Sequence, residues 1–246
     1  MNQAVEQAVI LAAGRGIRLG DQGARMPKGF LRLGDTPIIE ESLCRLRDAG
    51  IRKTLIVTGH LAERYDALAK TSGGFVETVH NERFADTGSL LSLLIAIDRL
   101  NGDTLLLESD LIYEPRALRA VQDGPADAIL LSGATGAGDE VFVETDDHGR
   151  LMAMSKDPTQ LGNIAGELVG ICRLTRKTQL RLRQWADTET ALDPGLEYEV
   201  DGLVAVGQRS ALCCTVVPDL VWAEIDDAVH LQRARTIVYP RIACLD

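Results

Sequence analysis

AVILAAGRGIRLGDQGARMPKGF, residues 8–30, is the stretch that decides the fold of this chain. Residues 8–12 form an uninterrupted apolar run, which is typical of a buried strand in a parallel sheet. The run ends in a glycine-rich turn, where a backbone without Cβ atoms can wrap its N–H groups around an anion. Arg15, Arg18, Arg25 and Lys28 follow closely. The sequence therefore predicts a phosphate-binding loop at the carboxyl end of the first strand.

Two common phosphate-binding motifs do not fit this loop. A Walker loop requires Ser or Thr directly after its Lys, whereas Gly29 follows Lys28. A dinucleotide fingerprint requires the spacing GxGxxG, and the glycines at 14, 16 and 20 are one residue too far apart. An ordinary strand-to-helix loop with surface arginines is the alternative, but the concentration of cations favours a phosphate site.

The rest of the chain alternates strand and helix patterns, which predicts an α/β fold with a mixed, mostly parallel central sheet flanked by helices. Further strands are predicted at 54–58, 75–79, 104–108, 127–133, 140–146, 147–156, 166–174, 212–217 and 221–225. Helices are predicted at 37–49, 61–70, 88–100, 176–187, 197–209 and 227–238. Asp146–Gly149 is a hairpin signal. We expect one domain over 1–246, with a nucleotide-binding half at about 1–125 and an acceptor-binding half at about 126–246.

Composition narrows the classes of partner. A net charge of −10 argues against a nucleic acid or an anionic membrane as partner, because phosphate contacts need a broad basic face. The five cysteines show neither CxxC nor zinc spacing, so they resemble reduced thiols. We find no signal region and no membrane-length apolar run, and we therefore expect a soluble, cytoplasmic protein. A homodimer is left open.

The signature LAAGRGIRLG followed by PKGFL resembles that of nucleotidyltransferases, which join an NTP to a phosphorylated small molecule and release pyrophosphate. Further similar stretches are NERFADTGSL (81–90), LLLESDLIYE (105–114), GAGDEVFVE (136–144) and WAEIDD (222–227). These resemble the cytidylyltransferase branch that acts on phosphocholine and 2-aminoethylphosphonate. The resemblance implies a Rossmann-like nucleotidyltransferase fold and transfer of CMP from CTP to 2-aminoethylphosphonate, in phosphonate biosynthesis.

Arg15 and Lys28 are the predicted catalytic residues. A guanidinium in the glycine turn can clamp β- or γ-phosphate oxygens in bidentate fashion, and Lys28 can bridge the α-phosphate and the acceptor. Thr87–Ser89 open a helix whose free N–H groups could bind a ligand, although a simple helix cap is equally compatible. The predicted nucleotide-binding residues are Leu11, Ala12, Ala13, Gly14, Arg15, Gly16, Arg18, Thr87, Gly88, Ser89 and Ser109.

A Mg²⁺ site is predicted from carboxylates that follow two strands. Asp110 follows one strand, and the resemblance places Asp226 as the second ligand. Mg²⁺ prefers one or two carboxylates together with phosphate oxygens and water. Glu224 lies two residues before Asp226, so both side chains point to the same face of the strand. Glu108 likewise lies two residues before Asp110 and points to the same face as Asp110. Glu108 is therefore an alternative ligand, whereas we expect Asp227 to cap the last helix.

The predicted acceptor is a small zwitterion whose amine seeks carboxylates. The candidate acceptor-binding residues are Asp139, Glu140, Glu144, Lys156 and Tyr198, and Glu197 and Glu199 are further candidates. Each carboxylate taken singly also fits a solvated acidic face. The resemblance implies that Lys156 meets the phosphonate.

Phosphocholine is the nearest alternative acceptor, and its quaternary ammonium would be recognised by a cage of aromatic side chains. Aromatic residues make up only 4% of the chain, which favours a primary amine. A sugar phosphate is a further alternative, and a catalytically silent nucleotide-binding regulatory module is an alternative of another class. An acceptor phosphonate is already ionised at neutral pH, so no general base is required. His60 fits a structural hydrogen bond better than catalysis.

Overall fold

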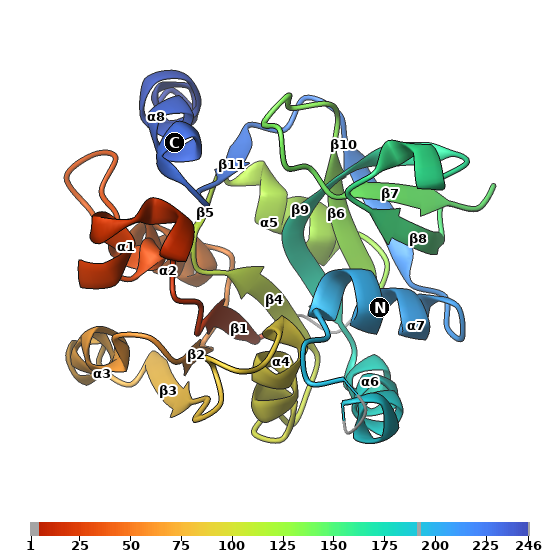
Figure 1. The fold of residues 1–246 in the computed structure, drawn as a ribbon, viewed down its shortest axis with the longest axis horizontal. Coiled ribbons are helices and arrows are strands. Elements are labelled where there is room, and N and C mark those ends of the chain that lie inside the picture. The colour runs from red at the N-terminus through yellow and green to blue at the C-terminus, as the bar shows by residue number, and fades with distance from the viewer. Residues whose placement is uncertain (1–4, 191–192, 246) are drawn as a thin grey trace.

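The computed structural model describes residues 5–190 and 193–245, and the centre of these is a nine-stranded mixed sheet (Figure 1). Its main path has the order β10-β6-β9-β4-β1-β2-β3. The first-half strands are β1 (Gln7–Ala12), β2 (Lys53–Thr58), β3 (Val76–His80) and β4 (Thr104–Glu108). The second-half strands on the path are β6 (Ala128–Ser132), β9 (Ile164–Leu174) and β10 (Cys213–Val217).

The apolar run that opens the chain lies inside this sheet as β1. It pairs in parallel with both β2 and β4, so Leu11 lies beside Val57 and Glu108. Residues 8–12 are all buried, as expected for a strand that is covered on both faces. Because β1, β2 and β4 run in the same direction, the glycine turn and the end of β4 share one edge of the sheet.

The second half joins the same sheet through antiparallel pairing. β9 pairs with β4 and with β6, and it also pairs with β7 (Phe142–Thr145), which in turn pairs with β8 (Leu151–Ser155). The predicted hairpin turn joins β7 to β8, where Asp146 Oδ1 accepts the N–H groups of His148 and Arg150, both at 2.9 Å. The predicted α/β fold with a mixed sheet is confirmed.

Helices cover both faces of the sheet because alternate strand residues point to opposite sides. Val9 and Leu106 pack in one core with α4 (Ser89–Ile97), α6 (Arg176–Glu189) and α7 (Val204–Gly207). Ile10 and Leu105 pack in a second core with α2 (Ile38–Asp48), α3 (Ala62–Thr71) and α5 (Arg116–Asp123). A π-helical turn, Tyr198–Leu203, leads into α7.

A third core lies beside the glycine turn. Its small antiparallel sheet pairs β5 (Leu111–Tyr113) with β11 (Trp222–Glu224). The helical elements around it are α1 (Asp21–Arg25), α8 (Ala228–Arg233), a π-helical segment (Ala234–Val238) and α9 (Tyr239–Ile242). Asp227 caps α8 by accepting the N–H groups of Val229 and His230, as predicted. Within 5–190 and 193–245, no helix has the length and apolar character to cross a membrane.

Candidate active site

Lys28 lies at the centre of the candidate site. Its ammonium donates to Asp110 Oδ2 at 2.6 Å and to Asp226 Oδ1 at 2.5 Å. The next residue, Gly29, packs tightly: a Cβ atom there would lie 2.9 Å from Tyr65 Oη and 3.0 Å from the carbonyl oxygen of Ser109. The Pro-Lys-Gly segment therefore lies directly against the end of β4, which brings Lys28 to Asp110.

The charges of this centre stabilise one another. Burial raises the pKa of Asp226, but the cations of Lys28 and Arg18 outweigh it and bring the pKa to about 2. Burial lowers the pKa of Lys28, whereas Asp110 and Asp226 raise it, and the net result is above its ordinary value. Lys28 and Asp226 are therefore both charged at neutral pH.

A cavity of about 300 Å³ opens beside Lys28. Most of the predicted nucleotide-binding residues line it, namely Leu11, Ala12, Ala13, Gly14, Thr87, Gly88, Ser89 and Ser109. Glu108, Asp110 and Glu224 line it as well. Its other lining residues include Tyr65, Phe84 and Ser92, which the sequence did not single out and whose place in the cavity depends on tertiary packing.

The amides of Gly88 and Ser89 at the start of α4 are not free, so of the two alternatives left open for Thr87–Ser89 the capped helix start fits. Gly88 N–H donates to Pro194 O at 2.9 Å, and Ser89 N–H donates to Glu197 Oε2 at 3.0 Å. A segment more than a hundred positions later therefore satisfies this helix start. All three residues line the cavity, but the backbone N–H groups of Gly88 and Ser89 are engaged within the chain.

The arginines of the glycine turn point to different places. Gly16 takes a left-handed backbone conformation with φ of 61°, which suits glycine, and Arg15 is exposed beside it. Arg18 pairs with Asp226 at 2.8 Å and lies 3.9 Å from Asp139. It therefore contacts carboxylates and does not line the cavity where we expected nucleotide.

Among residues 5–190 and 193–245, two groups of side chains could hold a metal ion. Glu108, Asp110 and Glu224 form one group, and Asp139, Asp226 and His230 form the other, with ligand atoms in each group within 4.8 Å of one another. The predicted set of Asp110, Asp226 and Glu224 is thus divided between them, and Lys28 contacts both groups. Glu108, which the sequence offered as an alternative ligand, lies with Asp110.

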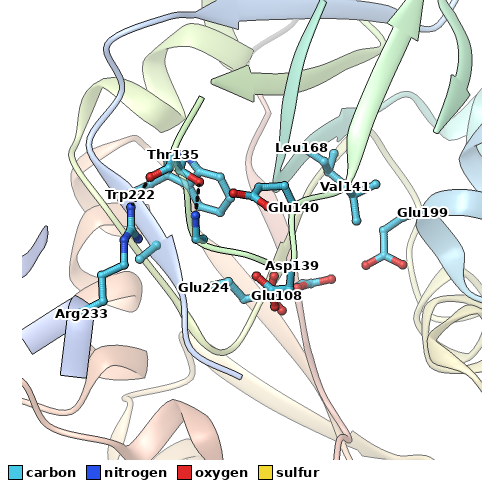
Figure 2. A pocket seen from close by; sticks show the side chains of 13 residues that line it. Glu108, Thr135, Asp139, Glu140, Val141, Leu168, Glu199, Trp222, Glu224 and Arg233 are labelled. Carbon is cyan, nitrogen blue, oxygen red and sulfur yellow. Dashed lines mark hydrogen bonds between the residues drawn. The ribbon is translucent and has the colours of Figure 1, made fainter. Parts of the chain in front are cut away.

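The predicted acceptor residues also lie in separate places, and Figure 2 shows two of them, Asp139 and Glu140, at one pocket. Asp139 and Glu140 line a pocket that adjoins the cavity. Glu144 lies elsewhere, and its Oε2 accepts the N–H of Gly162 at 2.9 Å. Lys156 is exposed. Tyr198 is fully buried and donates to Glu108 Oε1 at 2.8 Å, so it supports a carboxylate and does not line the pocket.

The pocket in Figure 2 is strongly acidic. Glu108, Glu199 and Glu224 line both this pocket and the larger cavity. Burial is the main cause that raises the pKa of each. Neighbouring carboxylates raise the pKa of Glu108 and Glu224 further, whereas the hydrogen bond with Glu108 partly offsets the rise in the pKa of Glu199. Such an environment favours a cationic ligand, because a positive charge would relieve the mutual repulsion of these groups.

His60 makes the structural hydrogen bond that we expected. Its ring Nε2 lies 3.3 Å from the carbonyl oxygen of Gly23, and its backbone N–H donates to Ala13 O at 3.3 Å. Four other residues near the pocket were missed by the sequence reasoning because no local motif marks them: Thr135, Glu167, His230 and Arg233.

Comparison with known proteins gives relatives that match more than half of the chain. It is 32% identical, over 90% of its length, to CMP-5'-(3-aminopropyl)phosphonate synthase of Streptomyces rubellomurinus. It is 31% identical, over 61% of its length, to 2-aminoethylphosphonate cytidylyltransferase of Lancefieldella rimae. The matched regions cover 37% and 60% of those relatives, so the chain spans only part of their length.

The fold is also that of solved nucleotidyltransferases. The CTP:phosphocholine cytidylyltransferase of Streptococcus pneumoniae superposes with a TM-score of 0.76 at 20% identity, covering 96% of this chain and 99% of that one. The family model described as MobA-like NTP transferase domain matches residues 8–170, which include the glycine turn, Lys28 and Asp110. The chain therefore belongs to the family of MobA-like NTP transferase domains.

Proposed function

We propose that this nucleotidyltransferase transfers CMP from CTP to 2-aminoethylphosphonate and releases pyrophosphate, as one step of phosphonate biosynthesis. The single observation that supports this most is the position of Lys28, held between two buried carboxylates at the edge of the cavity. The relatives' names supply the base and the class of acceptor. We propose residues 1–125 as the nucleotide half and 126–246 as the acceptor half.

The reaction brings a negatively charged acceptor oxygen to a negatively charged triphosphate. Its barrier is therefore lowered mainly by positioning the reactants and by electrostatic stabilisation of their charge. An acceptor oxygen attacks the α-phosphorus. The bond between that phosphorus and the oxygen that bridges the α- and β-phosphates breaks, and pyrophosphate leaves with the electron pair. Lys28 would neutralise charge on the α-phosphate and the acceptor oxygen, and Arg15 would bind the β- or γ-phosphate. The backbone of Leu11–Gly14 would receive the nucleoside.

Mg²⁺ fits the donor set, because the carboxylates around Lys28 offer the hard oxygen ligands that this ion prefers. Asp110, Asp226 and Glu224 are the residues proposed to hold it. Asp110 and Glu224 lie in one group with Glu108, and Asp226 lies in the other group, joined to Asp110 through the Lys28 ammonium. When bound, the ion supplies positive charge to the phosphates.

The acceptor's ammonium would lie in the acidic pocket that Asp139 and Glu140 line together with Glu108 and Glu199. The pocket adjoins the cavity, so a short zwitterion could reach from Lys28 into it. Trp222 is the one aromatic side chain lining the described part of this pocket. A single aromatic ring does not make a cage, which favours a primary amine over a quaternary one.

A second acceptor, 3-aminopropylphosphonate, is favoured by a specific observation. The relative that covers 90% of this chain carries that acceptor in its name. Both acceptors have a phosphonate and a primary amine, and they differ by one methylene. Discrimination between them by an apolar contact would be modest, about 10- to 200-fold.

The test is pyrophosphate release with Mg²⁺ and each of CTP, UTP, GTP and ATP, combined in turn with 2-aminoethylphosphonate, 3-aminopropylphosphonate, phosphocholine and a sugar 1-phosphate. The proposal expects the highest kcat/KM with CTP and 2-aminoethylphosphonate. Preference for phosphocholine, for a sugar phosphate or for another NTP would replace the acceptor or the base. CTP binding without pyrophosphate release in any mixture would support the silent regulatory module instead.

A further inference from the structure

The loop that carries Asp139 and Glu140 is held at one point by two side chains from distant elements. Thr135 N–H donates to Glu167 Oε2 of β9 at 2.9 Å, and Thr135 O accepts from Arg233 Nη2 of α8 at 2.9 Å. Figure 2 shows Arg233 reaching the backbone of Thr135 at the edge of the pocket. The N–H and the carbonyl oxygen of Thr135 are thus both bonded to charged side chains. Hydrogen bonds to charged groups are stronger than those between neutral groups.

A third contact links the same helix to the functional end of the loop. His230 Nε2 lies 3.4 Å from Asp139 Oδ1, and the His230 side chain is buried. His230 and Arg233 are three positions apart in α8, so they lie on one face of the helix. That face therefore contacts the loop at both Thr135 and Asp139.

The loop needs such support because its own sequence gives it little rigidity. Residues 133–140 contain three glycines, of which Gly136 and Gly138 have φ of 63° and 104°. No regular helix or strand is formed between β6 and β7. Glu167, in contrast, is 4% exposed in the rigid β9 strand, and Arg233 projects from a helix that begins directly after Asp226 and Asp227.

We propose that Arg233 and Glu167 are positioning residues for the acceptor: by fixing the backbone of Thr135 they place Asp139 and Glu140 in the pocket. This inference rests on the proposed function, in which those two carboxylates meet the acceptor's ammonium. Neither residue lines the nucleotide cavity. Arg233 lines the acidic pocket beside Thr135, whereas Glu167 lines neither space and therefore tests the positioning role most directly. Loss of either should weaken acceptor binding and leave CTP binding alone.

The experiment compares KM for the acceptor and KM for CTP in Arg233→Gln, Glu167→Ala and Glu167→Gln. Arg233→Gln and Glu167→Ala should each raise the acceptor KM about tenfold and leave the CTP KM within about twofold, since each removes one charge-assisted hydrogen bond. Glu167→Gln retains a side-chain oxygen that can accept Thr135 N–H, so it should remain close to wild type. Arg235→Gln is the matched control, because that exposed arginine contacts only Arg32 O, at 3.5 Å, in the described hydrogen bonds.

Hydrogen exchange of the 133–140 peptide gives a readout that does not depend on the acceptor. Its amides should exchange faster in Arg233→Gln and Glu167→Ala than in wild type or Arg235→Gln. Equal changes in both KM values, or unchanged exchange in the loop, would overturn the inference. If phosphocholine proves to be the acceptor, the proposed acceptor is wrong, but the KM comparison applies to that substrate unchanged. If no acceptor is turned over, the exchange experiment alone decides whether the two residues fix the loop.

Discussion

Lys28 and Asp226 are 198 positions apart in the sequence, yet Lys28 Nζ and Asp226 Oδ1 lie 2.5 Å apart. The contact joins the loop after β1 to the end of β11, and Asp226 is 4% exposed. A buried carboxylate of this kind requires a cation close by. In the proposed reaction Lys28 neutralises charge on the α-phosphate, so the triphosphate of CTP would compete with Asp226 for the same ammonium.

Replacing Lys28 by Ala should lower pyrophosphate release by at least about a hundredfold, the loss that follows removal of one preorganised charge at a transition state. The same change leaves Asp110 and Asp226 without their shared cation and should destabilise the fold by about 3 kcal/mol. Initial rates should therefore be measured at a temperature at which circular dichroism shows the variant folded.

The control for that variant is Lys53→Ala. Lys53 pairs with Glu77 on the exposed start of β2, and both side chains are about half exposed. Its removal should leave the rate and the stability nearly unchanged. A Lys28→Ala enzyme that works at a rate close to wild type would contradict the role given to Lys28.

Asp110→Asn should raise the Mg²⁺ concentration needed for half-maximal rate by about tenfold or more. Loss of a residue that only hydrogen-bonds a metal ligand already weakens metal binding by about that factor, so loss of a ligand should do at least as much. Asn keeps the shape of the side chain and removes its charge. The measurement is the rate as a function of Mg²⁺ concentration at saturating CTP. The exposed carboxylate of Asp219 gives the control Asp219→Asn. An unchanged Mg²⁺ requirement would exclude Asp110 as a ligand.

Local patterns predicted the fold because the β1 run, the glycine turn and the alternation of strands and helices are short-range signals. They also placed Asp110 at the correct edge of the sheet, since parallel strands end together. They failed where a partner comes from far along the chain. The amides of Gly88 and Ser89 are bonded by residues 194 and 197, and Arg18 is turned toward Asp226.

Burial was the other property that sequence patterns missed. The sequence predicts Tyr198 at the acceptor because it is one of the few aromatic side chains that could contribute to a cage around an ammonium group. The π-helical turn Tyr198–Leu203 directs its ring into the core beneath Glu108. A single sequence gives no signal for such a turn, whose register depends on packing against α4 and α6.

Gly29→Ala should destabilise the protein by about 1–3 kcal/mol and lower the transfer rate, because the new Cβ overpacks the site. It would lie 2.9 Å from Tyr65 Oη and 3.0 Å from Ser109 O, and the strain would displace the neighbouring Lys28. Tyr65→Phe removes the closer of these two atoms. The double variant should therefore recover part of the lost stability, and urea unfolding of all four proteins measures that coupling. Strictly additive effects would show that Tyr65 and Gly29 do not make this contact.

Glu114 should make the stability of the protein depend on pH in the acid range. The side chain is 2% exposed, and it accepts from Arg116 at 2.8 and 2.7 Å and from Val221 N–H at 2.8 Å. Burial raises the pKa of Glu114, but the hydrogen bonds from Arg116 and Val221 outweigh it, so the folded pKa lies below the ordinary value of 4.5. The carboxylate therefore stabilises the fold fully above pH 4.5, and this contribution is lost as pH falls through the folded pKa.

Glu114→Gln imitates the protonated side chain and tests this sign. At pH 7 it should lower the free energy of unfolding by about 1–3 kcal/mol, since hydrogen bonds to a charged group are lost. The difference from wild type should shrink as the pH falls below 4.5, because the wild-type carboxylate then takes up the proton that the amide imitates. Asp219→Asn, which alters the exposed partner of Arg116, should show a much smaller difference at either pH. A gap between wild type and Glu114→Gln that widens in acid would mean that the folded pKa is raised, and the proposed stabilisation by Arg116 and Val221 would be wrong.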